Sequence, residues 1–257
     1  MLRFIHISDT HLGPDADHIR YGRNTYADAK AIVDFINNGL EFEPDFVLHA
    51  GDVINEPNAE ASRLAAGLFG ELRFPTWYVL GNHDDRAMMR ADLMGLPASD
   101  APLYYDFRVD DFHFLTLDSR GEIDPQGFIS AEQLDWLAES CRESDARSLV
   151  LLVHHLPLRM GVEWVDRDMR IMNDEAFFTM LRPHRERLRG IFFGHIHRAF
   201  TGFHDGILCS ASASTFMQFH MNPHDEQARF DTTAPGGYAI VSMTHEQTTV
   251  THHSLPR

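Results

Sequence analysis

Short apolar segments that end abruptly at polar side chains constrain the fold of this chain more than any other feature. Five segments end at side chains able to bind a metal ion: Asp9 and His11, Asp52, Asn82 and His83, His154, and His195 and His197. Apolar residues with helical spacing at 25–40 and 58–72 separate the first three segments. This alternation predicts parallel strands joined by right-handed crossovers. Because ligands gather outside the carboxyl ends of such strands, we expect Asp9, Asp52 and Asn82 to lie together.

The rest of the chain continues as strands with fewer helices. Further strands are predicted at 103–109, 112–117, 148–153, 190–193, 199–203, 207–210, 238–243 and 248–253. Further helices are predicted at 85–93, from Ser130 onward and at 174–181, with Ser130 and Gln133 forming a capping box. Residues 14–24 and 158–172 are predicted loops, and 216–235, which has no period, is a predicted cap or flap. No linker divides the chain, so we expect a single domain, 1–257.

Composition narrows the classes of partner. The formal net charge of −16 over 257 residues argues against nucleic acid or a polybasic membrane contact as the main partner. No apolar run approaches the roughly 20 residues that a membrane span needs. Cys141 and Cys209 lie in dissimilar contexts, which favours free thiols in a reducing compartment. Since the candidate ligands begin at Asp9, we expect no signal peptide and a cytoplasmic location.

The candidate ligands offer nitrogen and oxygen atoms and no thiolate. Such a set suits Fe, Mn, Zn or Co better than Ca or Mg. Seven ligands are too many for one tetrahedral ion, and they suit two ions about 3.5–4 Å apart that share a carboxylate. Such a pair polarises a phosphoryl oxygen and supplies a hydroxide that attacks phosphorus in line. The chain has neither a Gly-x-Ser-x-Gly elbow nor a glycine-rich phosphate loop.

Other polar residues have simpler interpretations. His49 lies inside a predicted strand, so we interpret it as a buried structural histidine. His220 and His224 are interpreted as surface or cap histidines. Arg170 and Asn173 are candidate substrate contacts from the loop that follows His154.

The five motifs, in this order, resemble those of the calcineurin-like metallophosphoesterases. These are Asp9-x-His11, Gly51-Asp52, Gly81-Asn82-His83-Asp84, His154 and Gly194-His195-x-His197. The resemblance implies an α/β fold in four layers, αββα, with two mixed sheets flanked by helices. It also implies two metal ions, held by Asp9, His11 and His197 and by Asn82, His154 and His195, with Asp52 bridging them.

The resemblance further implies roles in catalysis. His83 would contact the phosphate and assist the leaving oxygen, and Asp84 would orient His83. Asn82 and His197 would also contact the substrate, and Asp52 would act in catalysis as the bridge. His154 and His155 are both candidates for the same ligand position. In similar proteins the first histidine of such a pair is the ligand, so the resemblance implies His154.

Within the family, the chain resembles class III cyclic nucleotide phosphodiesterases and bacterial glycerophosphodiesterases. Segments 214–219 and 231–236 resemble cyclic AMP phosphodiesterases, and Met217 stands where glycerophosphodiesterases have histidine. We therefore expect a metal-dependent enzyme that hydrolyses small phosphodiesters, with 3',5'-cyclic AMP favoured. Glycerophosphodiesterase, broad-specificity phosphodiesterase, phosphonate monoester hydrolase, phosphomonoesterase and lipid-A-precursor pyrophosphatase activities are alternatives. A nuclease and a non-catalytic metal-binding scaffold are less favoured. The apolar residues 216–219 suggest either a dimer contact or a pocket wall, so a homo-oligomer stays open.

Overall fold

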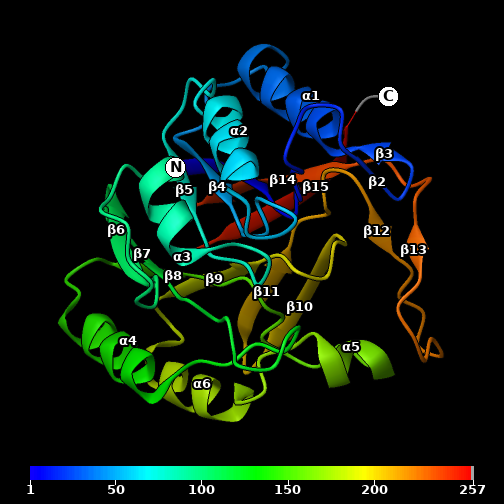
Figure 1. Cartoon of the computed structure of the whole chain (residues 1–257). Helices are drawn as coiled ribbons and strands as arrows, with labels where there is room; N and C mark the ends of the chain where they lie inside the picture. The colour runs from blue at the N-terminus through cyan, green and yellow to red at the C-terminus, as the bar shows by residue number, and fades with distance from the viewer. Residues whose placement is uncertain (256–257) are drawn as a thin grey trace.

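Two mixed β-sheets lie face to face, with helices on both outer faces, in the computed structural model of the chain (Figure 1), which describes residues 1–255. The first sheet has the order β15-β14-β1-β4-β5. Its strands are β1 (Leu2–Ile7), β4 (Phe46–His49), β5 (Thr76–Tyr78), β14 (Gly237–Met243) and β15 (Thr248–Ser254). Strands β1, β4 and β5 are parallel, and β14 and β15 are antiparallel additions. The predicted parallel pairing of these three strands is confirmed.

The second sheet has the order β10-β11-β9-β8-β7-β6. Its strands are β6 (Tyr105–Val109), β7 (Phe112–Thr116), β8 (Ser148–Leu152), β9 (Leu188–Phe193), β10 (Phe200–His204) and β11 (Ile207–Ala211). Strands β7, β8, β9 and β11 are parallel neighbours, whereas β6 and β10 run antiparallel at the two edges. The sheet is therefore mixed, as the resemblance implied.

Helices cover the outer face of each sheet (Figure 1). Above the first sheet lie α1 (Thr25–Asn38), α2 (Ala59–Phe69) and α3 (Arg86–Met88), which continues as a π-helix at Met89–Leu93. Below the second sheet lie α4 (Ala131–Glu143), α5 (Glu163–Asp168) and α6 (Asp174–Leu181), followed by a 3₁₀ turn at Arg182–His184. The four predicted layers are confirmed. Within residues 1–255, no helix has both the length and the apolarity that crossing a bilayer would require.

Side-chain alternation along the strands divides the apolar interior into three layers. On β1, Phe4 points between the sheets, whereas Ile5 and Ile7 point to α1 and α2. On β8, Val150 points between the sheets and Leu151 packs toward α4, α5 and α6. Both sheets are thus buried on two faces, which explains why their parallel strands read as nearly continuous apolar runs.

Polar caps set where the long helices begin. The side-chain oxygens of Asn24, Asn58 and Ser130 accept hydrogen bonds from the first turns of α1, α2 and α4. The predicted capping box is only half present, because the Gln133 side chain does not reach back to Ser130. It exchanges two hydrogen bonds, at 2.8 and 2.9 Å, with the backbone of Asp118 instead.

Three predicted irregular segments contain short elements. Residues 158–172 hold α5, and residues 14–24 hold a hairpin of β2 (Ile19–Arg20) and β3 (Arg23–Asn24). Residues 216–235 hold a ribbon of β12 (Gln218–Phe219) and β13 (Phe230–Asp231). Elements this short show no sequence period. The suggested dimer contact at 216–219 is wrong for its apolar side chains, because Phe216, Met217 and Phe219 are buried within their own chain.

Candidate metal centre

The predicted ligands gather where the two sheets meet, and both sheets contribute. The first sheet supplies Asp9, His11, Asp52 and Asn82 after β1, β4 and β5, and the second supplies His154, His195 and His197 after β8 and β9. Two groups form, each with ligand atoms within 4.8 Å of one another: Asp9, His11, Asp52 and His197, and Asp52, His154 and His195. Asp52 belongs to both groups, as expected of a bridging carboxylate.

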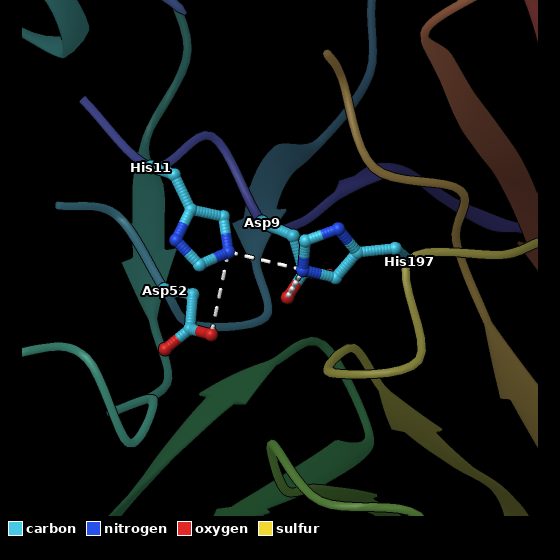
Figure 2. Close-up of side chains that lie close together, drawn as sticks. All are labelled: Asp9, His11, Asp52 and His197. Carbon is cyan, nitrogen blue, oxygen red and sulfur yellow. Dashed lines mark hydrogen bonds and ion pairs between the residues drawn. The ribbon is translucent and has the colours of Figure 1, made fainter. Parts of the chain in front are cut away.

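The first group converges on one point (Figure 2). The Nε2 atoms of His11 and His197 face each other at 3.0 Å, and His197 Nε2 lies 3.6 Å from Asp9 Oδ1. Buried imidazole nitrogens at this distance can share one hydrogen at most, whereas a cation between them satisfies both lone pairs. In the second group, His195 Nδ1 lies 3.2 Å from His154 Nε2 in the same manner. The donor set therefore fits two metal ions.

Asp52 connects the two groups through one oxygen. Its Oδ2 lies 3.5 Å from His11 Nε2 in the first group and 3.3 Å from His154 Nε2 in the second. Its Oδ1 accepts a hydrogen bond of 2.9 Å from the backbone N–H of His83. One oxygen is thus held by the chain while the other faces both groups.

Backbone carbonyls orient two of the imidazoles. His154 Nδ1 donates to the Ala50 carbonyl at 2.7 Å, and His197 Nδ1 donates to the Met217 carbonyl at 3.2 Å. With a proton on Nδ1, each Nε2 keeps its lone pair for a metal. Met217, which the sequence suggested only as a specificity position, therefore acts through its backbone on a predicted ligand.

Left-handed backbone conformations concentrate at the ligands. Eight non-glycine residues among 1–255 have positive φ, and five of them are predicted ligands: Asp9 at 56°, His11 at 45°, Asp52 at 54°, His195 at 68° and His197 at 51°. Such conformations are uncommon and cluster at functional sites. The chain bends sharply as it leaves each strand, and these bends turn the side chains back toward the gap between the sheets.

Two motif glycines are required by close approach. A Cβ at Gly81 would lie 2.1 Å from Asp52 Oδ1 and 2.2 Å from Asp52 N. A Cβ at Gly194 would lie 1.9 Å from Ser8 Oγ and 3.0 Å from Asp9 Oδ2. Any larger residue would displace the carboxylate on which each group depends.

Burial and charge shift the pKa values of the cluster in opposite directions. Burial raises the pKa of Asp9 to about 7, and the nearby Asp52 adds to that rise. Burial also acts to raise the pKa of Asp52, but His154 and His11 outweigh it and hold that pKa well below the usual range. Burial acts to lower the pKa of His154, yet Asp52 raises it to about 9. Burial disfavours the charged forms of these carboxylates, and bound cations would stabilise them.

Asn82 is held by a residue that the sequence did not indicate. Its Nδ2 donates to Asp124 Oδ1 at 2.8 Å, and its Oδ1 is buried without a hydrogen-bond partner among residues 1–255. The amide oxygen is thereby left available as a metal ligand. Asp124 lies in the polar segment 120–127, where no periodicity or motif distinguishes it from any turn carboxylate.

The Asn55 carbonyl, and not the expected Asp84 carboxylate, is the hydrogen-bond partner of the His83 side chain. His83 Nδ1 donates to the Asn55 carbonyl at 2.6 Å. The Asp84 carboxylate instead accepts from the backbone N–H groups of Val53, Ile54 and Gly81 at 2.9–3.1 Å. Asp84 therefore holds together the loops that follow β4 and β5, and it orients His83 only through them.

Several further predictions can be compared with the structure. His154 rather than His155 joins the second group, and His155 Nδ1 bonds Ser119 Oγ at 2.7 Å. Arg170 is buried and paired with Asp174 at 2.8 Å, so its suggested substrate contact is wrong.

Asn173 also has a structural role, since its side chain bonds both the N–H and the carbonyl of Ile129. His49 is buried and bonds Thr10 Oγ1 at 3.1 Å, as expected of a structural histidine. The thiols of Cys141 and Cys209 are free and buried.

A small cavity of about 260 Å³ opens beside the second group. Asn82 and His83 line one side, and the segment from Arg120 to Gln126 lines the other. Its size suits a compact polar group such as a phosphoryl group, and it gives that group access to the imidazole of His83.

Comparisons with known proteins agree with this geometry. Residues 2–199 match the family model described as calcineurin-like phosphoesterase. The 3',5'-cyclic adenosine monophosphate phosphodiesterase CpdA of Escherichia coli is 30% identical over 237 residues, which cover 91% of this chain and 83% of that protein. The glycerophosphodiester phosphodiesterase GpdQ of Enterobacter lignolyticus is 26% identical, covering 97% and 90%. A dimetal phosphatase structure from Danio rerio has a TM-score of 0.65 at 18% identity, covering 97% and 98% of the two chains.

Proposed function

Since the chain belongs to the calcineurin-like phosphoesterase family, as its motifs predicted, we propose that this metal-dependent phosphodiesterase acts on 3',5'-cyclic AMP. The observation that carries the enzymatic assignment is the position of Asp52 Oδ2 between two groups of buried ligands. The likeness to CpdA over 91% of the chain supports the cyclic nucleotide. The likeness to GpdQ supports glycerophosphodiesters as the second candidate.

Asp9, His11 and His197 would hold one ion, Asn82, His154 and His195 the other, and Asp52 both. Two bound ions, with Fe, Mn, Zn and Co as the candidates, supply polarisation of a phosphoryl oxygen and a water of lowered pKa. Asn82 and His197, which belong to different proposed ion sites, would contact the phosphoryl group of the substrate. The proposal places the protein in the cytoplasm as a single domain, 1–257, with 216–235 as its cap.

His83 is the proposed acid for the leaving oxygen. Its Nδ1–H is engaged by the Asn55 carbonyl at 2.6 Å, which leaves Nε2 as the nitrogen that can meet the substrate. In its cationic form, His83 donates the Nε2 proton to the oxygen that departs from phosphorus and becomes neutral. The short bond to Asn55 holds the ring in place during that transfer.

Turnover assays test the proposed function. Protein loaded with Mn²⁺ should hydrolyse bis(p-nitrophenyl) phosphate and cyclic AMP, and a chelator should abolish both activities. The variant His83→Ala should lower kcat by about 10²–10⁴-fold with unchanged metal content, because it removes the acid and no ligand. The exposed His204→Ala serves as the control. No turnover of any phosphodiester by the metal-loaded protein would overturn the proposal.

A further inference from the structure

A second, larger cavity adjoins the one beside the metal centre. Its volume is about 580 Å³, within the range of about 300–1,000 Å³ typical of small-molecule sites. Arg120, Gly121, Glu122 and Gln126 line both cavities. A molecule whose phosphoryl group lies beside Asn82 and His83 can therefore extend past this shared wall into the larger cavity.

The larger cavity has apolar walls that the fold does not cover. Ile123, Phe128 and Met172 line it and are 67%, 49% and 38% exposed. They converge because the Gly127 carbonyl accepts a hydrogen bond of 2.8 Å from Met172 N, which joins the two segments that carry them. Large apolar side chains left exposed around one concave site mark a place where a ligand is bound.

The shared wall also presents an unpaired cation. The side chain of Arg120 donates one hydrogen bond, of 2.7 Å, from Nη1 to the Asp84 carbonyl, and it forms no ion pair with the carboxylates of residues 1–255. Arg86, the other cation of the cavity, is neutralised by Asp118 at 2.7 Å. Arg120 is therefore anchored at one nitrogen, and the rest of its flat guanidinium is free for a ligand.

We propose that the larger cavity binds the organic group esterified to phosphorus, and that it selects groups with an aromatic ring, such as a nucleoside. The inference rests on the proposed function. An aromatic ring can stack on Phe128 and on the guanidinium of Arg120, both of which attract π-faces. Glycerol has no ring to stack and would leave most of the cavity to water. The residues that set specificity thus lie in 120–128, outside the metal-binding motifs.

Matched substrates and variants test this assignment. We compare kcat/KM for cyclic AMP with kcat/KM for glycerophosphoethanolamine, a diester without an aromatic ring, in the Mn²⁺-loaded protein. Loss of stacking on one base corresponds to about a tenfold effect, so Phe128→Ala should lower the cyclic AMP to glycerophosphoethanolamine ratio about tenfold. Phe128→Tyr should keep the ratio. Phe203→Ala, which removes a ring exposed on β10, should also keep it.

Arg120→Ala supplies a second test on a different side chain. It should lower the same ratio, and adenosine, which lacks phosphorus, should compete more weakly in both alanine variants than in the wild type. An unchanged ratio in Phe128→Ala and Arg120→Ala, with an active wild type, would overturn the assignment of the cavity. A wild type that turns over no diester would instead overturn the proposed function, and this inference with it.

Discussion

His6 makes the stability of this protein depend on pH in a way that one substitution should remove. Its side chain is fully buried between the sheets, edge-on to Phe192 with ring centroids 5.9 Å apart. Neither ring nitrogen has a hydrogen-bond partner among residues 1–255. Burial, with help from His252 and His49, lowers the pKa of His6 from 6.5 to about 3, and the nearby Phe193 backbone opposes the shift only in part.

The sign and size of the effect follow from that shift. The unfolded chain takes up a proton at His6 as the pH falls below 6.5, whereas the folded chain takes it up only near pH 3. The contribution of neutral His6 to stability is therefore complete above pH 6.5 and is lost progressively as the pH falls from 6.5 to 3. At about 1.4 kcal/mol per pKa unit, about 2 kcal/mol of the free energy of unfolding is lost by pH 5.

The variant His6→Leu has no proton to take up and no unpaired buried nitrogen. The free energy of unfolding of His6→Leu, relative to that of the wild type, should rise by about 2 kcal/mol between pH 7.5 and pH 5. Urea unfolding of the metal-free proteins at the two pH values measures this difference. The metal-site histidines are common to both proteins, so their titration cancels.

The exposed His224→Leu is the control and should show no such growth. A stability difference between His6→Leu and the wild type that stays constant from pH 7.5 to pH 5 would refute the reasoning.

Two other substitutions test how the metal centre is built. Asp124→Ala should lower the affinity for one of the two ions about 10–100-fold, because it frees the amide of a ligand, and titration with Mn²⁺ measures the loss. The exposed Asp135→Ala should bind both ions normally. Gly81→Ala should lose metal binding, since the new Cβ would lie 2.1 Å from Asp52 Oδ1. Gly67→Ala, where a Cβ meets nothing within 4 Å, should keep it and gain about 0.5–1 kcal/mol of helix stability. Full metal content in Gly81→Ala would contradict the close packing described here.

The positions of the ligands could be predicted because polar residues at the ends of buried strands have few roles other than binding. An Asp or His that directly follows a buried apolar run has few structural roles, so its type and position point to a site. The two sheets and their flanking helices followed from the same runs and from the resemblance. The left-handed conformations of Asp9, His11 and His197 have no such signal, because they depend on bends that the packed sheets impose.

The loop contacts could not be predicted for the opposite reason. Arg170 and Asn173 looked available for a substrate because they lie in a polar segment. In the structure, however, both side chains form hydrogen bonds or ion pairs with other residues of the chain. Asp124 looked unremarkable and holds Asn82. Which polar side chain of a loop meets a neighbour is decided by tertiary contacts, and residue type alone does not encode them.

Ligands drawn from both sheets also determine when the protein can acquire its metal ions during synthesis. Asp9 and Asp52 emerge early, but His195 and His197 follow β9, and the first sheet is finished only by β14 and β15 near the C-terminus. A nascent chain therefore lacks the full set of predicted ligands until His197 has left the ribosome. Because both sheets supply ligands, neither group of ligands is complete until the two sheets have packed together.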